Sequence, residues 1–182
     1  MPAILTSLQR IIRLFDENKI DYMIIGGYAL PFYGRIRTTV DLDLAVAVMN
    51  RKEFDSLIHL LIKADFEPTI CSPQNPLIFV VDRRAGIEIE LWIKPDGIVF
   101  DEETLKRRRK AKLDRELTAW IVSPEDFIIT KLARPDRGVT DEQDVKSVLV
   151  RQADKIDTVY LKKRAREAQV TVILDAIQNS EE

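Results

Sequence analysis

The stretch "IGGYALPFYGRIRTTVDLDLA", residues 25–45, follows a glycine pair with two basic residues and ends in aspartates at alternate positions. Along a β-strand alternate side chains share one face, so Asp41 and Asp43 are expected to project together. Leu42 and Leu44 then face the core. Burying two carboxylates is costly unless a cation meets them, so the stretch predicts a cation site.

The oxygen ligands of Asp41 and Asp43 favour Mg2+ or Mn2+, which bind through one or two carboxylates and complete their coordination with water and phosphate. The alternative is a solvated strand face, because alternating polar residues are common there. The segment "GIEIELW" places Glu88 and Glu90 on one face of a second strand. If the two strands are neighbours, either glutamate can join the metal site or act as a base.

Gly26 and Gly27 come after a predicted strand and before a short helical segment. A glycine turn of this kind lets backbone N–H groups approach an anion closely. Arg35, Arg37 and Thr38 follow as further phosphate donors. Metal ligands, an anion-binding turn and basic residues in one segment predict a site for a nucleoside triphosphate.

The composition of the chain limits the classes of protein to which it can belong. The chain has 182 residues, of which 46% are hydrophobic and 32% charged, with a formal charge of -2 and a single cysteine, Cys71. These values predict a soluble cytoplasmic protein with no membrane segment and no internal disulfide. The near-neutral charge means that a polyanion would have to bind to a local patch.

Periodicity predicts a mixed sheet with helices packed on it, an α/β fold. Strands are expected near 21–27, 38–48, 67–70, 77–82, 86–93 and 117–123, with a hairpin turn at 83–86. Helices are expected over 4–18, 28–33, 50–63, 102–110 and 157–178, with further starts at Ser123-Pro124 and at a Thr140/Gln143 capping box. We expect a core domain over residues 1–122 and a C-terminal helical region over 123–182, packed on that core.

The densest basic run is "KRRRKAK", residues 106–112. Its simplest interpretation is a solvated helix balanced by the acidic residues before it. The functional alternative is a track for the phosphates of an RNA acceptor.

The spacing of "GG" and "VDLDL", with an acid on a later strand, resembles the nucleotidyltransferase superfamily that includes DNA polymerase beta. It is most similar to the small prokaryotic branch: toxins of the AbiEii type, minimal nucleotidyltransferases, and lincosamide and aminoglycoside nucleotidyltransferases. The segment "VSPEDFIITKLARPDRGVTDEQDV" also resembles that branch. The resemblance covers residues 22 to about 150 and implies a nucleotidyltransferase core flanked by helices.

The resemblance also assigns roles to individual residues. It implies that Gly26 and Gly27 hold the triphosphate and that Asp41 and Asp43 hold the metals. Among the glutamates it favours Glu90, because "ELWI" matches an acid followed by an apolar run. Two further matches are Lys131, expected to reach phosphate, and the downstream pair Asp141 and Asp144, to which no role is assigned. The second glycine is often serine in relatives, and the third acid is usually aspartate.

The implied reaction is Mg2+-dependent transfer of a nucleoside monophosphate from an NTP to a hydroxyl acceptor. The favoured acceptors are RNA or protein in a toxin–antitoxin or defence setting, with an antitoxin as a partner. One alternative keeps the chemistry and changes the acceptor to an antibiotic hydroxyl. The other is a relative without turnover that binds a nucleotide or a partner.

Overall fold

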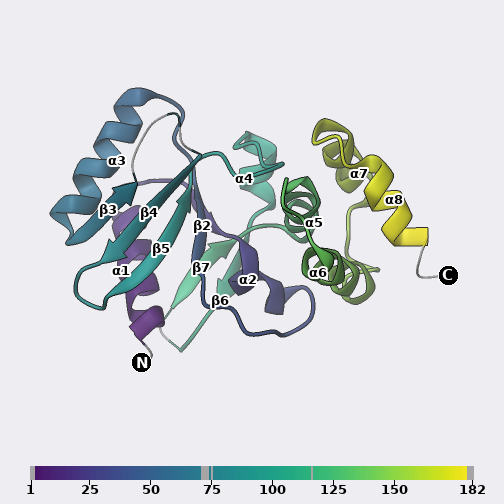
Figure 1. The fold of residues 1–182 in the computed structure, drawn as a ribbon, viewed down its shortest axis with the longest axis horizontal. Helices are drawn as coiled ribbons and strands as arrows, with labels where there is room; N and C mark the ends of the chain where they lie inside the picture. Colours follow the sequence, from purple (N-terminus) through teal and green to yellow (C-terminus); the bar gives the residue numbers. More distant parts are fainter. Residues whose placement is uncertain (1–2, 71–73, 75, 116, 180–182) are drawn as a thin grey trace.

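The computed structural model describes residues 3–70, 74, 76–115 and 117–179. The described chain forms one seven-stranded mixed sheet with the order β3-β4-β5-β2-β1-β7-β6, as Figure 1 shows. The predicted α/β class is therefore confirmed. The strands are β1 Tyr22–Ile24, β2 Asp43–Val46, β3 Phe66–Ile70, β4 Leu77–Asp82, β5 Ile87–Trp92, β6 Arg109–Lys112 and β7 Thr118–Ile121.

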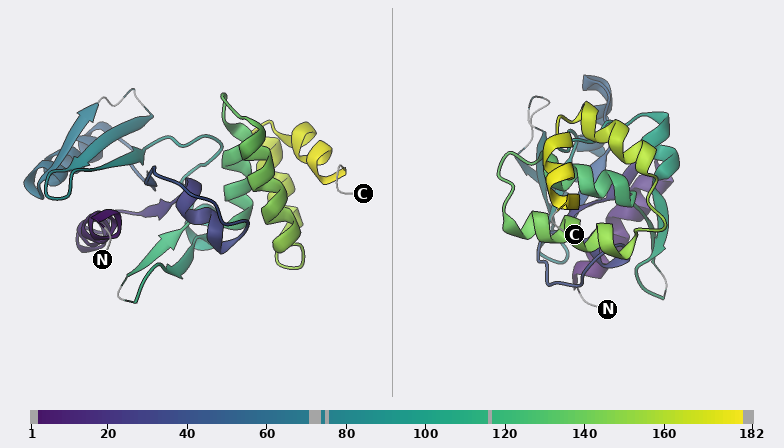
Figure 2. Two further views of the ribbon diagram at one scale, coloured as in Figure 1. Left: turned by 60° about the horizontal axis from the view of Figure 1, so that its bottom comes forward. Right: turned by 90° about the vertical axis from the view of Figure 1, so that its right-hand side faces the viewer.

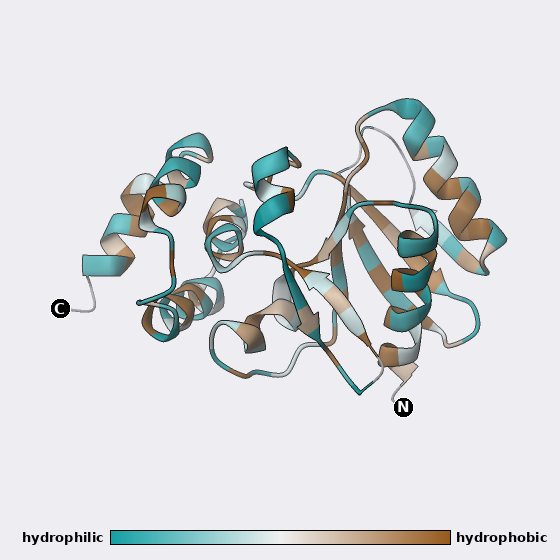
Figure 3. Ribbon diagram, turned by 180° about the vertical axis from the view of Figure 1, so that it is seen from behind, coloured by the Kyte–Doolittle hydropathy of each residue, from teal (hydrophilic) through white to brown (hydrophobic). Residues whose placement is uncertain are grey.

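Helices α1 and α3 lie on the sheet, whereas α5 to α8 gather beyond one of its ends (Figures 1 and 2). The helices are α1 Ala3–Glu17, α2 Gly26–Ala29, the 3-10 turn η1 Leu30–Phe32, α3 Arg51–Lys63, α4 Glu102–Arg107, α5 Pro124–Ala133, α6 Val139–Arg151, α7 Thr158–Glu167 and α8 Thr171–Asn179. Figure 3 shows hydrophobic residues along the central strands and hydrophilic turns on the helices around them. Within the described residues no helix is both long and apolar enough to cross a membrane.

The central strands β1, β2 and β5 determine where the acidic side chains lie. Strand β2 pairs antiparallel with β1 and parallel with β5, and Asp43 lies directly beside Glu90 in the second pair. The two acidic strands are therefore neighbours, as the sequence interpretation required. The predicted hairpin is also present, because β4 and β5 pair antiparallel across Ala85 and Gly86.

The strand expected over residues 38–48 is much shorter in the structure. Pairing begins where Glu90 N–H donates to the Leu42 carbonyl at 2.9 Å, and regular strand begins at Asp43. Asp41 therefore precedes the strand. The reason lies in the preceding loop: Arg35 and Arg37 bind Asp144 of α6, so this segment follows the helix and not the sheet.

Two other boundaries also need correction. The helix expected over residues 102–110 ends at Arg107, because Arg108 adopts extended backbone and donates to the Tyr22 carbonyl. The residues after it form the edge strand β6. Helix α6 begins at Val139 and not at the predicted Thr140/Gln143 box, because Asp141 accepts the Gly138 N–H at 3.1 Å.

The predicted helix starts at Asn50 and Ser123 are confirmed, since each side chain accepts a backbone N–H three residues ahead. The last strand ends at Ile121 and α5 begins at Pro124. The division of the chain into domains 1–122 and 123–182 stays a prediction.

Replacing Leu44 by Ala tests how far the acidic strand depends on the core. Leu44 is fully buried in β2, so Leu44→Ala should lower the free energy of unfolding by about 2–5 kcal/mol in urea denaturation. Val40→Ala is the matched control, because Val40 is 77% exposed four residues earlier and should change little. Equal effects of the two substitutions would contradict this placement of the strand.

Candidate active site

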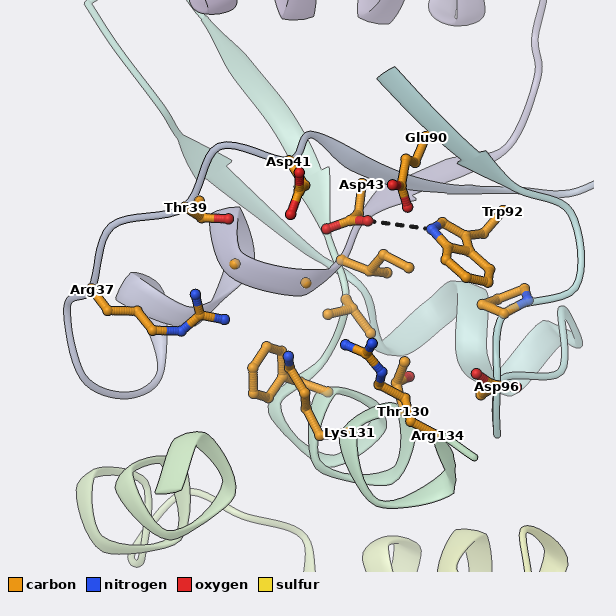
Figure 4. A pocket seen from close by; sticks show the side chains of 16 residues that line it. Arg37, Thr39, Asp41, Asp43, Glu90, Trp92, Asp96, Thr130, Lys131 and Arg134 are labelled. Atoms are coloured by element: carbon orange, nitrogen blue, oxygen red, sulfur yellow. Dashed lines mark hydrogen bonds between the residues drawn. The ribbon is translucent and has the colours of Figure 1, made fainter. Parts of the chain in front are cut away.

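A cavity of about 210 Å³ lies where the loop before β2 and the ends of β1 and β5 meet helix α5. Figure 4 shows Asp41, Asp43 and Glu90 on the sheet side. It shows Arg37, Lys131 and Arg134 on the side of the helices and the loop, where Asp96 also lies. Its polar lining residues, with one tryptophan, are Arg37, Thr39, Asp41, Asp43, Glu90, Trp92, Asp96, Thr130, Lys131 and Arg134.

The acidic side is built on the pairing of β2 and β5. Asp43 and Glu90 lie side by side in the paired strands, and Trp92 Nε1 donates to Asp43 Oδ1 at 3.3 Å. Burial raises the pKa of Asp43, and the nearby charge of Asp41 adds to this. Burial, followed by the charge of Asp43, raises the pKa of Glu90 to about 7. Ionisation of both carboxyl groups is therefore disfavoured when no cation neutralises them.

This donor set fits a hard divalent cation. Two adjacent carboxyl groups with raised pKa values lie where one cation can neutralise both, and oxygen ligands are those that Mg2+ and Mn2+ prefer. Asp41 lines the same cavity and can supply a third carboxylate. Within the described part of the chain, no three His, Cys, Asp or Glu side chains are already grouped as a metal cluster.

The two glycines allow the turn after β1 to pack directly against the acidic side. Gly26 has a φ of +63°, and a Cβ there would lie 2.2 Å from Asp43 Oδ2. At Gly27 a Cβ would lie 2.4 Å from the Oγ1 atom of Thr39. A larger residue at either position would displace a side chain of the cavity. In this chain Thr39 fills the space that a serine at the second motif position would need.

The basic side consists of Arg37, Lys131 and Arg134. Lys131 is 5% exposed and its Nζ lies 2.8 Å from Asp141 Oδ1. Arg134, the residue directly after α5, binds the exposed Asp136 at 2.9 Å. Three cations facing a metal-type acid set can neutralise a polyanion held between the two sides.

Most of the residues singled out in the sequence meet at this cavity. The structure brings together Gly26, Gly27, Arg37, Asp41, Asp43, Glu90 and Lys131. Arg35, Thr38 and Glu88 are not among the lining residues. Arg35 donates to Asp144 at 2.7 Å and to Gln143 at 2.8 Å, so its guanidinium is engaged outside the cavity.

The positions of Thr38 and Glu88 along their segments explain why neither residue lines the cavity. Thr39, and not Thr38, faces the glycine turn. Glu88 is exposed and lies two residues before the position that pairs with Asp43. The geometry therefore favours Glu90 as the third acid.

Sequence reasoning missed four polar lining residues: Thr39, Asp96, Thr130 and Arg134. Helical spacing would not have marked Arg134, because α5 ends at Ala133 and Arg134 already has extended backbone. Asp96 lies in an irregular segment after β5, where no periodicity marks it.

The basic run at 106–112 is largely engaged within the fold. Arg107 binds Asp157 at 2.8 Å and lies over the Tyr160 ring, and Arg108 lies over Trp120. The structure thus favours a structural role for these two arginines.

A known protein family matches almost the whole chain. Residues 3–181 match the family described as "Nucleotidyltransferase of unknown function (DUF6036)". This confirms the resemblance drawn from the sequence motifs. The search of curated proteins finds no match.

Solved structures share the fold at low sequence identity. A nucleotidyltransferase-like antigenic protein from Paracoccidioides brasiliensis has a TM-score of 0.56 and 20% identity, over 95% of this chain and 91% of that one. The antibiotic-resistance factor ANT(2'')-Ia has a TM-score of 0.56 and 15% identity, over 94% and 96%. The lincomycin-bound lincosamide adenylyltransferase LnuA has a TM-score of 0.53 and 16% identity, over 79% and 94%.

The raised pKa of Glu90 predicts a specific pH dependence of stability in metal-free protein. Its folded pKa of about 7 exceeds the ordinary value of 4.5, so the folded state binds the extra proton between these values. Stability from this group is complete below pH 4.5 and is lost as the pH rises to about 7. Glu90→Gln should remove this loss.

Thermal unfolding of both proteins in a chelator, from pH 4 to 8, checks this prediction. The melting temperature of the Glu90→Gln variant minus that of the unsubstituted chain should increase as the pH rises from 4 to 8. A constant difference at every pH would show that Glu90 is not held in this environment.

Proposed function

Since this chain belongs to the nucleotidyltransferase family matched by residues 3–181, we propose that it moves a nucleoside monophosphate from an NTP to a hydroxyl acceptor, using Mg2+ or Mn2+. One observation carries the proposal: a single cavity has three carboxyl groups on one side and three cations on the other. A metal-bound triphosphate has the complementary charges for both sides.

The acidic side binds the cation in this proposal. Asp41 and Asp43 are the ligands, with Glu90 as the third acid. When bound, the cation favours ionisation of the attacking hydroxyl and neutralises charge on the phosphates. The Trp92 N–H, which donates to Asp43, holds that carboxylate in place.

The remaining residues hold the NTP. Arg37, Lys131 and Arg134 face the triphosphate, and the Gly26–Gly27 turn permits its close approach to backbone N–H groups. The acceptor oxygen attacks the α-phosphorus, the bond from that phosphorus to the bridging oxygen breaks, and pyrophosphate leaves. The hydroxyl proton passes to a cavity carboxylate, for which we propose Glu90.

For the acceptor we propose RNA or protein in a toxin–antitoxin or defence setting. The exposed residues Arg109 and Lys110 on edge strand β6 offer contacts for the phosphates of RNA. An antibiotic hydroxyl is the second candidate. It is supported by the fold that the chain shares with LnuA and ANT(2'')-Ia, and by Asp96, which gives the cavity a further acid for a cationic acceptor.

Label transfer distinguishes these acceptors. Each α-labelled NTP would be incubated with the protein and Mg2+ or Mn2+ in the presence of total RNA, cell protein, aminoglycosides or lincosamides. We expect label in RNA or protein. Label in an antibiotic alone would establish the second candidate, and NTP binding without label in any pool would favour a binding protein without turnover.

Substitution of the acids should abolish transfer without unfolding the chain. Asp41→Asn, Asp43→Asn and Glu90→Gln should each lower the rate by at least about 10²-fold, because each removes a carboxylate that would hold the cation facing the reacting phosphates. Their melting temperatures should not fall, since each substitution relieves repulsion among carboxylates.

The matched control is Glu88→Gln, which makes the same change on the same strand outside the cavity. It should leave the transfer rate unchanged. If Glu88→Gln were inactive and Glu90→Gln active, the proposed third acid would have to be exchanged.

A further inference from the structure

Helix α6 carries two buried acids, Asp141 and Asp144, that do not line the cavity. They are three residues apart and therefore lie on one face of the helix. Asp144 is fully buried and Asp141 is 7% exposed. Buried carboxylates are retained where cations meet them, and here the cations are those of the cavity.

Asp144 holds the arginine that reaches the cavity from the loop before β2. Arg37 donates to it from two nitrogens, at 3.1 Å from Nη2 and 3.2 Å from Nε, both to Oδ2. Arg35 donates to Oδ1 of the same carboxylate at 2.7 Å. The loop has no regular secondary structure, so these contacts fix the direction of the Arg37 guanidinium.

Asp141 holds the cations of α5. It accepts from Lys131 at 2.8 Å and lies 3.6 Å from Arg134. The Gly138 N–H also donates to it, at 3.1 Å. Although burial works against ionisation, the hydrogen bonds from Lys131 and Gly138 keep the pKa of Asp141 below its ordinary value. Lys131 also lies 3.6 Å from Asp144, so the two acids form one network.

The network keeps a surplus of positive charge. Four cations, Arg35, Arg37, Lys131 and Arg134, meet three carboxylates, those of Asp144, Asp141 and the exposed Asp136. The difference, four minus three, leaves one positive charge. Cations that are held but not fully neutralised can still bind an anion at the cavity.

We propose that Asp144 and Asp141 are positioning residues, which hold Arg37, Lys131 and Arg134 in the arrangement that receives the triphosphate. The inference rests on the proposed function, because it concerns the same cavity. A site whose cations are fixed before binding loses less conformational freedom when the anion arrives.

The direction of the change in anion affinity distinguishes a positioning role from a purely electrostatic role and from a purely structural one. By Coulomb attraction alone, removing a negative charge beside an anion site strengthens anion binding. A purely structural role lowers the melting temperature but leaves the affinity of the folded protein unchanged. Positioning predicts weaker binding by folded protein, even though the local charge becomes more positive.

The experiment measures binding of inorganic tripolyphosphate with Mg2+ by calorimetry, because this probe carries the anion of any NTP and no base. Asp144→Asn should weaken binding about 10- to 100-fold, the usual range for residues that orient a ligand-binding group. Asp144→Glu should restore most of the affinity, since it keeps a charged acceptor for Arg37. Asp141→Asn should weaken binding in the same direction and serves as the second test if Asp144→Asn does not fold.

Glu142→Gln is the control, because it removes the same charge from the same helix at a residue that faces Arg137 and not the cavity. It should bind tripolyphosphate as the unsubstituted chain does. Unchanged or tighter binding by folded Asp144→Asn or Asp141→Asn would overturn the positioning role alone. If the unsubstituted chain bound neither tripolyphosphate nor any of the NTPs, the proposed function would fail together with it.

Discussion

The parallel pairing of β2 with β5 places Asp43 beside Glu90, and the rest of the site depends on this contact. Both strands run in the same direction, so residues in register point to the same face and the two carboxyl groups meet. Such a pair is unfavourable as two charges, and burial raises the pKa of both carboxyl groups. The surrounding residues either offset this negative charge or leave space for a cation that can offset it.

Strand alternation also explains why Trp92 belongs to the site. It follows Glu90 by two residues, so it shares the cavity face while Leu91 is buried on the other. Its indole N–H then reaches Asp43 across the strand pair. The turn at Gly26 closes the opposite side of Asp43, where a Cβ would collide with the carboxylate. Asp43 is thereby held from two directions by groups that leave its cavity side open.

Local periodicity predicted the strands and the faces that the acids share, because alternation depends on neighbouring residues. The pairing of β2 with β5, which brings Asp43 beside Glu90, was only a condition of that prediction. Alternation in "VDLDLA" and "IEIELW" indicates the shared faces, and the side chains of Asn50 and Ser123 mark helix starts. The basic side depends on contacts between distant segments, which no local pattern records. Arg35 and Arg37 looked equivalent in the sequence, yet both bind Asp144, more than 100 residues away, and only Arg37 also lines the cavity. The same long-range contact drew the loop off the sheet and shortened the predicted strand.

The C-terminal helices are therefore part of the site and not an appendage. The core strands supply carboxylates, and α5 with the residue after it supplies two of the three cations that face them. Helix α6 lines none of the cavity, but its acids contact cations from both α5 and the loop before β2. A division between residues 122 and 123 would separate the acidic side from most of the basic side. The charges of Lys131 and Arg134 interact with that of Asp43 across the cavity, so the two sides attract each other. The charges that bind a metal-bound triphosphate in our proposal thus also give the two parts of the chain a reason to remain together.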